Sequence, residues 1–199
     1  HPSRIHPPGG KKREPIRVLF VGADVRPNRL ALKRLVRRIW SDTAARLSRE
    51  AELHLAGAMC RHLAADDRRP GIVVHGFVHD LEPLWAQCNI FVNPVDIGAG
   101  IKIKNVEALC HGLPLVTTPH SLIGIEAAKG AGAVACDSDQ ALADALVHLI
   151  ENDARRERAA EAALASARQM FSPDKVYGEL YAFIEEGVAA SRDQPPGGA

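Results

Sequence analysis

Residues 89–118 read NIFVNPVDIGAGIKIKNVEALCHGLPLVTT, and their pattern decides the class of fold. Apolar, β-prone residues at 90–93 and 115–118 predict two strands, and the segment 101–111 between them predicts a helix. A strand, a helix and a second strand joined by short connections are typical of a parallel sheet covered by helices. This stretch therefore predicts an α/β fold.

The same alternation continues on both sides of this stretch. Residues 16–22 (IRVLFVG) form a nearly continuous apolar run ended by glycine, which predicts a strand buried on both faces. Further strands are expected at 53–56, 72–75 and 133–136, and further helices near 59–65, 80–87, 139–150 and 153–170. Together these elements predict a Rossmann-like three-layer α/β/α sandwich with a parallel sheet of about six strands.

The helix predicted after the first strand is amphipathic. Asn28 is expected to cap its N-terminus. Its apolar face, with helical spacing, consists of Leu32, Leu35, Val36, Ile39 and Trp40. Its other face is basic and consists of Arg29, Lys33, Arg34, Arg37 and Arg38. A solvated helix face is favoured over a docking patch for these bases.

Composition places the chain among ordinary globular proteins. Its 199 residues are 46% hydrophobic, and 25 Lys+Arg stand against 24 Asp+Glu, for a net charge of +1. This balance argues against a disordered chain and against a nucleic-acid binder. Residues 1–15 are rich in Pro, Gly and basic residues and predict a linker. Residues 16–190 predict one domain, whose last helix is capped by Ser172, and residues 191–199 predict a disordered tail.

The sequence indicates neither a membrane-spanning helix nor a metal site. The longest uncharged run, residues 108–125, contains glycines and prolines, and no signal peptide is evident, so a cytoplasmic location is expected. The cysteines are far apart in apolar segments and are interpreted as buried thiols: Cys60, Cys88, Cys110 and Cys136. His75 and His120 fall at the expected ligand edge, but neither has a carboxylate or second histidine at ligand spacing, so no metal site is predicted.

Residues 93–107 contain the groups best suited to bind a phosphate. Gly98 and Gly100 allow backbone N–H groups to face a ligand, and the following helix N-terminus attracts phosphate. Lys102 and Lys104 add positive charge, and Glu107 lies one turn after Lys104, where it can accept from ribose hydroxyls. The alternative is that the glycines form a turn and that Lys104 pairs with Glu107. The loop lacks the Walker ending and fits the dinucleotide fingerprint poorly.

Residues 89–118 resemble the donor-binding segment of the group 1 retaining glycosyltransferases of the GT-B fold, with a Gly-Lys-rich loop, Glu-Ala-Leu and Gly-Leu-Pro-Leu-Val. VLFVGADVRPN resembles the first strand and loop of their C-terminal domain, and VVHGFVHDLEPLWAQCNIFV resembles its middle strands. The likeness covers residues 16–184, and residues 98–114 are its most specific part. The resemblance implies half of a GT-B enzyme.

The resemblance also implies roles for individual residues. The nucleotide diphosphate would be held by the loop around Gly98, Ala99, Gly100 and Ile101 and by Lys102 or Lys104. Glu107 would bind the ribose hydroxyls. Gly76, Phe77 and Val78 match a loop that contacts the base, largely through its backbone.

Two positions depart from the family pattern. The glutamate that usually contacts the donor sugar falls at Ala99, and Asp96 is either its substitute or a turn residue. The Arg and Lys that many members place after the first strand fall near Ala23 and Asn28. Lys102, Lys104 or Arg26 would then carry the charge that faces the phosphates.

The function implied is transfer of a glycosyl group from a nucleotide-diphosphate sugar to an acceptor hydroxyl with retention. Lys102 and Lys104 would stabilise the leaving diphosphate without a metal or cofactor. The acceptor-binding N-terminal domain is expected to be missing from this chain, which would leave the chain inactive alone and leave any peripheral membrane contact to the absent domain. Two alternatives stay open. One is a sugar-nucleotide epimerase of the same fold. The other is a non-catalytic receiver-like domain, although such a domain needs an acidic cluster at the end of the first strand and only Asp24 stands there.

Overall fold

The computed structural model describes residues 15–172. A six-stranded sheet lies at its centre, and every pair of neighbouring strands is parallel. The strands are β1 (Ile16–Val21), β2 (Ala51–Ala56), β3 (Ile72–Gly76), β4 (Ile90–Asn93), β5 (Leu115–Thr117) and β6 (Ala133–Ala135). The predicted α/β fold with a parallel sheet of six strands is therefore confirmed. The expected linker before Pro15, the helix after Ser172 and the tail lie outside the described residues.

The strand order is β3-β2-β1-β4-β5-β6. This is the order of doubly wound nucleotide-binding folds, in which ligands bind where the winding reverses. The reversal lies between β1 and β4, which pair through Val18 with Ile90 and Leu19 with Phe91. The loops after β1 and β4 therefore emerge side by side at the carboxyl edge of the sheet. The order also differs from the 2-1-3-4-5 order of receiver domains, which excludes that alternative.

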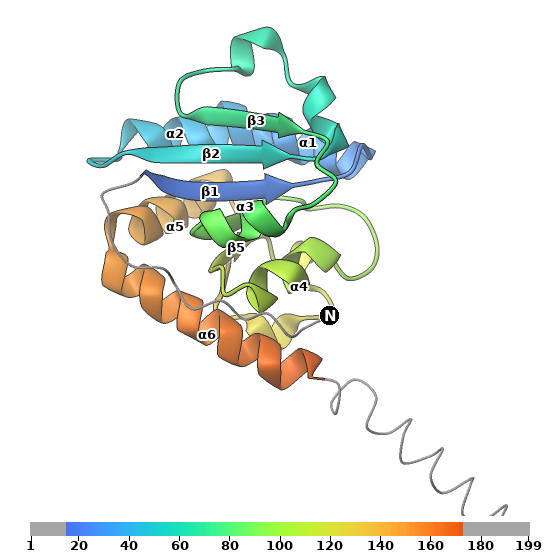
Figure 1. Cartoon of the computed structure of the whole chain (residues 1–199), viewed down its shortest axis with the longest axis vertical. Coiled ribbons are helices and arrows are strands. Elements are labelled where there is room, and N and C mark those ends of the chain that lie inside the picture. The colour runs from blue at the N-terminus through green and yellow to red at the C-terminus, as the bar shows by residue number, and fades with distance from the viewer. Residues whose placement is uncertain (1–14, 173–199) are drawn as a thin grey trace, which may run out of the picture.

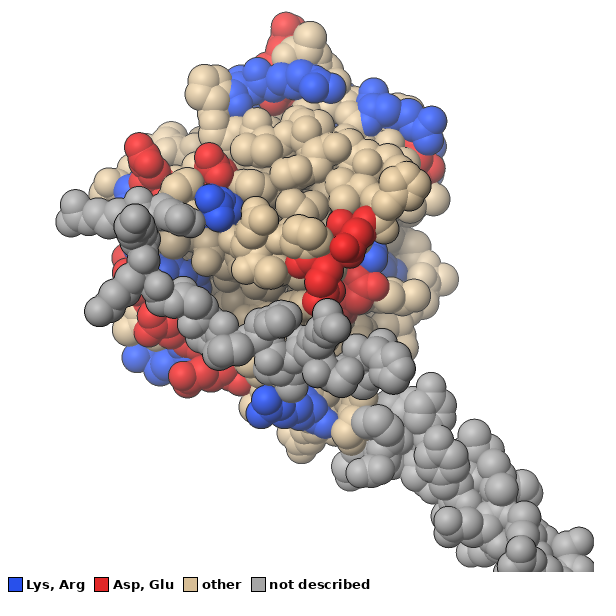
Figure 2. Space-filling view, viewed as in Figure 1, with Lys and Arg blue, Asp and Glu red and all other residues tan. Residues whose placement is uncertain are grey.

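Helices cover both faces of the sheet (Figure 1). One face packs against α1 (Arg26–Arg34), η1 (Leu35–Ile39), α2 (Trp40–Ala45) and α5 (Asp139–Glu151). The other packs against α3 (Glu82–Gln87), α4 (Ile103–Cys110) and α6 (Asp153–Phe171). Short 3₁₀ turns are η2 (Ala58–His62), η3 (Ala65–Asp67), η4 (His120–Leu122) and η5 (Glu126–Ala128). Acidic and basic side chains are interspersed on the face that Figure 2 shows.

The first helix differs from the prediction at its start. It begins at Arg26 with Pro27 in its first turn, and its N-cap is Val25, so Asn28 is not the cap. Proline presets the helical φ angle and has no N–H to satisfy, which favours an earlier start. The Asn28 amide instead donates to the Ala23 carbonyl at 3.0 Å. The predicted apolar face is buried, but residues Leu35–Ile39 form a π-helical segment that the spacing did not indicate.

Two further elements are shorter than predicted. The expected helix at 59–65 is only the 3₁₀ turn η2, which follows Gly57 at φ 106° and ends at Leu63 in extended conformation. The helix expected from Asp80 begins at Glu82, because the Asp80 carboxylate accepts from the Glu82 N–H at 2.9 Å and forms a turn.

The four cysteines are free, as predicted. Cys60, Cys88 and Cys136 are buried and Cys110 is half-buried. Burial raises the pKa of the Cys88 thiol to about 12 and that of Cys136 to about 11. Within residues 15–172, no helix is both long enough and apolar enough to cross a membrane.

Candidate functional site

The β4–α4 loop (residues 94–102) joins the central strand β4 to the N-terminus of α4. Gly98 and Gly100 have φ angles of 101° and 74°, in the region that favours glycine. A Cβ at Gly100 would meet nothing within 4 Å, so its backbone is open to a ligand. Among the described residues, no side chain caps the N-terminus of α4, which leaves its dipole available. The loop thus combines open backbone with an uncapped helix N-terminus, an arrangement that favours an anion.

Two side chains converge on the carbonyl groups of this loop. The Lys102 ammonium donates to the carbonyls of Gly98, Ala99 and Gly100 at 3.2, 3.4 and 2.9 Å. The ring of His120, from the loop after β5, lies with its Nε2 2.7 Å from the Gly98 carbonyl and donates to it. These contacts satisfy the loop carbonyls from one side and hold its curvature. His120 therefore joins the candidate site, although its position after a strand was the only signal for it in the sequence.

Lys104 and Glu107 face each other on the first turns of α4. The Lys104 ammonium lies 2.6 Å from the Glu107 carboxylate, and both side chains are 35% exposed. This is the pairing that the simpler interpretation of the sequence expected. Both groups nevertheless stay accessible at the edge of the loop, so the pair presents one donor and one acceptor to a ligand.

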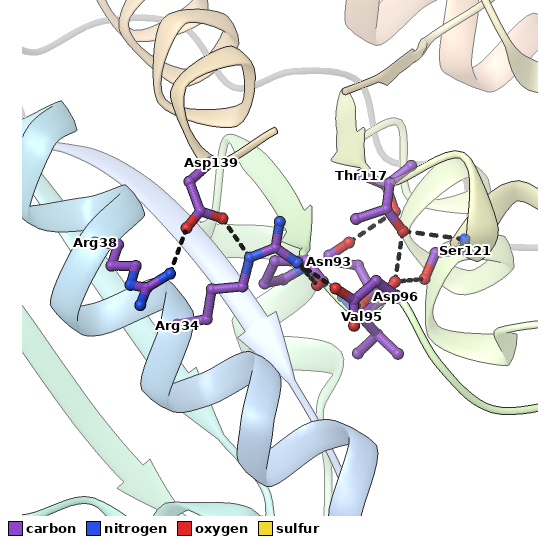
Figure 3. Close-up of polar contacts among 10 residues, drawn as sticks. Arg34, Arg38, Asn93, Val95, Asp96, Thr117, Ser121 and Asp139 are labelled. Atoms are coloured by element: carbon purple, nitrogen blue, oxygen red, sulfur yellow. Dashed lines mark hydrogen bonds and ion pairs between the residues drawn. The ribbon is translucent and has the colours of Figure 1, made fainter. Parts of the chain in front are cut away.

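A buried polar network lies beneath the loop and fixes its first residues (Figure 3). The Asn105 side chain accepts from the Asn93 amide at 2.7 Å and donates to the Ser121 carbonyl at 2.8 Å. The hydroxyls of Thr118 and Ser121 both donate to the Val95 carbonyl, at 2.5 and 2.6 Å. Because these groups are buried and paired, they specify one loop conformation.

Arg34 connects three elements beside this network. Its guanidinium donates to Asp139, the first residue of α5, to the Pro94 carbonyl at 3.3 Å and to the Asp96 carboxylate at 2.7 Å (Figure 3). Asp96 is thus ion-paired with the end of α1. This contact gives Asp96, the candidate for the sugar contact, a structural role, while its side chain stays 58% exposed.

The loop after β1 carries an acidic residue surrounded by bases. Asp24 lies 2.6 Å from Arg61 Nη2 and 2.7 Å from His62 Nε2, both on η2, and 3.6 Å from Arg29 Nε. The loops after β1 and β2 touch closely, because a Cβ at Gly57 would lie 2.1 Å from the Gly22 carbonyl oxygen. Arg61 is therefore tied to the loop after β1 through its contact with Asp24.

A cavity of about 510 Å³ opens beside these loops. Gly76 and Phe77, predicted to contact a base, line it together with Arg61 and Arg68. Val78 does not line it, because its side chain packs against the core under α3 and α4. The structure therefore brings two of the three predicted residues to a cavity and directs the third inward.

Sequence reasoning missed the surroundings of His75. His54 Nδ1 lies 3.0 Å from His75 Nε2, and His54 Nε2 lies 3.0 Å from the Glu52 carboxylate. Residue spacing along the chain did not indicate this contact of His75 with His54. The three residues lie on the neighbouring parallel strands β2 and β3, and the register of those strands could not be read from residue spacing. Among the described residues, no group of three or more His, Cys, Asp or Glu side chains is placed to hold a metal ion.

The family model described as glycosyl transferases group 1 matches residues 15–152. The chain belongs to the group 1 glycosyl transferases. The match contains the β4–α4 loop, α4 and the cavity-lining residues, so the candidate site lies within the family region. No curated protein matches the sequence of this group 1 domain.

Solved structures show the same fold at low sequence identity. TarM of S. aureus superposes with a TM-score of 0.67 at 12% identity, over 89% of this chain and 37% of TarM. Anabaena HepE, solved with UDP, has a TM-score of 0.65 at 17% identity, over 86% of this chain and 49% of HepE. The C-terminal domain of LpcC from Francisella tularensis has a TM-score of 0.64 at 13% identity, over 79% of this chain and 87% of the LpcC domain. The group 1 domain thus has the C-terminal GT-B fold and spans less than half of the first two proteins.

Proposed function

We propose that this group 1 domain binds the nucleoside diphosphate of a nucleotide-sugar donor at the β4–α4 loop. In the complete enzyme it would present the donor sugar to an acceptor hydroxyl, with retention of the anomeric configuration. The observation that carries the proposal is the convergence of the open backbone at Gly100, the uncapped start of α4 and the Lys104–Glu107 pair at the edge between β1 and β4.

The charges at this edge support a donor orientation. The diphosphate would lie against the backbone of Ala99, Gly100 and Ile101, where the dipole of α4 and the Lys102 and Lys104 ammonium groups attract anions. The Glu107 carboxylate would accept from the ribose hydroxyls while Lys104 turns to a phosphate. The base would then lie toward Gly76 and Phe77 at the cavity.

The chemistry proposed for this site is stabilisation of the leaving group. As the bond between the sugar and the diphosphate breaks, negative charge grows on the departing phosphate oxygen. Preorganised amides and two ammonium groups stabilise this charge more than they stabilise the bound donor, which lowers the barrier. His120 would act through the loop, because its donation to the Gly98 carbonyl holds the loop in shape.

The proposal also covers the rest of the enzyme. HepE and TarM are about two to three times as long as the part that this chain matches, so the acceptor would be bound by a segment outside that match. A cytoplasmic site of action follows if the donor is drawn from the nucleotide-sugar pool. Product analysis with the complete enzyme distinguishes a glycosylated acceptor from the free sugar that an epimerase would release.

Calorimetry with nucleoside diphosphates tests the site on the 199-residue chain. Lys104→Ala and Glu107→Ala are each expected to weaken binding roughly tenfold, because each removes a charge-assisted contact of about 1.5–3 kcal/mol. Lys129→Ala is the matched control, since Lys129 is exposed in the segment that leads into β6. Undiminished affinity in both α4 variants would overturn the assignment of this site.

A further inference from the structure

The cavity beside the candidate site has a cationic wall. Arg61 and Arg68 line it, and no carboxylate belongs to its lining among the described residues. Both arginines lie in the segment that joins β2 to β3. An occupant that offers acceptor atoms to this wall is therefore favoured over one that offers N–H groups.

Arg61 is held in place by a single carboxylate. Its Nη2 atom lies 2.6 Å from Asp24, while its side chain remains 65% exposed. One amino group of the guanidinium is thus engaged, and the remaining N–H donors stay available to a ligand. Asp24 lies in the loop after β1, so its contact ties Arg61, which lines the cavity, to that loop.

Other residues of the cavity lining suit a flat ring. Phe77 is 67% exposed, so much of its ring is accessible, and it meets the His79 ring in a T-shaped arrangement at a centroid distance of 4.9 Å. Gly76 has a φ angle of 69°, and a Cβ there would meet nothing within 4 Å. Two small residues, Gly57 and Ala58, also belong to the lining. A volume of about 510 Å³ accommodates a purine.

We infer that the cavity selects guanine as the donor base, through Arg61 and Arg68. Guanine carries two neighbouring acceptors, O6 and N7, which match the two parallel N–H groups of a guanidinium. Adenine places an amino donor beside N7 and would oppose an arginine donor. Uracil has a single-ring surface to stack on Phe77 and lacks the N7 acceptor. The inference rests on the proposed function, because it assigns the base of the nucleotide whose diphosphate the β4–α4 loop would hold.

Calorimetric titration of the 199-residue chain with GDP, ADP and UDP tests the inference without any variant. GDP is expected to bind at least about tenfold more tightly than the other two, since a bidentate arginine contact discriminates by about this factor or more. Arg61→Ala and Arg68→Ala are expected to reduce the affinity for GDP and to change the affinity for UDP by less than about threefold. Arg61→Lys keeps the positive charge but loses the two parallel N–H groups of the guanidinium, so this variant should also lose the preference for GDP.

Arg69→Ala is the matched control. Arg69 is the sequence neighbour of Arg68, but its guanidinium turns to the Val36 carbonyl at 3.4 Å and it does not line the cavity. Equal affinity for GDP, ADP and UDP, or a GDP preference that survives both alanine variants, would overturn the inference while leaving the diphosphate site in place. Failure of every nucleoside diphosphate to bind would instead refute the proposed function itself.

Discussion

Arg34 Nη1 lies 2.7 Å from Asp96 Oδ2, so the last residue of α1 holds the start of the loop that follows β4. The same guanidinium also reaches Asp139 at the start of α5. One side chain therefore joins two helices to the loop proposed to bind phosphate. The relationship explains how a glycine-containing loop keeps a single shape at the edge of the sheet.

Arg34→Ala should weaken nucleoside diphosphate binding several-fold, because the loop loses its tether. It should also lower the free energy of unfolding by about 1–3 kcal/mol, since charge-assisted hydrogen bonds of a partly buried group are lost. Calorimetry and urea unfolding measure the two effects. Arg38→Ala is the control: its side chain is 76% exposed and 3.6 Å from Asp139, so a change below about 0.5 kcal/mol is expected. Equal effects of the two variants would contradict the role of Arg34.

Asn105→Leu should destabilise the domain by about 1–3 kcal/mol or more. The Asn105 side chain is fully buried, and its loss leaves the Asn93 amide and the Ser121 carbonyl without this partner. Gln140→Leu removes an exposed amide from α5 and should cost far less. Urea unfolding of both variants gives the comparison, and similar midpoints would argue against the network beneath the loop.

Gly57→Ala should destabilise the domain by at least about 2 kcal/mol. A Cβ at this position would lie 2.1 Å from the Gly22 carbonyl oxygen, and the φ angle of 106° is itself unfavourable for alanine. Gly130→Ala separates the two causes. Gly130 has a φ angle of 76° but an open Cβ position, so only the backbone strain of about 1 kcal/mol is expected. Thermal unfolding that ranks Gly130→Ala as the more damaging change would refute the close approach of these loops.

The stability of the domain should fall as the pH drops below 6.5. Burial of the ring, and secondarily the nearby His54, hold the pKa of His75 below its ordinary value of 6.5. The unfolded chain therefore binds a proton at higher pH than the folded domain, so stability is lost as pH falls through 6.5 and levels off below the folded pKa.

His75→Asn should reduce this pH dependence, which urea unfolding at a series of pH values between about 5 and 8 would measure. His148→Asn, on the exposed side of α5, controls for the replacement of a histidine as such. An identical pH dependence in wild type and His75→Asn would rule out His75 as its source.

The sheet and its helices could be predicted because hydrophobic periodicity reports burial directly. The run at 16–21 and the stripe from Leu32 to Trp40 are buried as the spacing indicated. Helix starts were less predictable, since Asn28 competed with Pro27 and the proline determined the first turn. The π-helical segment at Leu35–Ile39 has no sequence signature, because its apolar and basic residues also suit an ordinary α-helix.

The parts of the candidate site that are close together in the sequence could be predicted, and the contacts between residues far apart in the sequence could not. Gly98, Gly100, Lys102 and Lys104 lie in one loop and its helix, so their proximity follows from the order of the residues. The contacts of Arg34 with Asp96 and of Asp24 with Arg61 join residues 62 and 37 positions apart. Such contacts depend on strand order and helix orientation, which a single sequence does not determine.

The packing of α6 limits how far the chain can be shortened from its C-terminal side. A Cβ at Gly132 would lie 2.3 Å from the Ala163 Cα, and Ala163 and Ala167 are part of the core under α4. The family match ends at residue 152, immediately before this helix. A fragment trimmed to that boundary would uncover the apolar side of α4 and be prone to aggregate, so expression of a stable domain requires the chain to continue through Phe171.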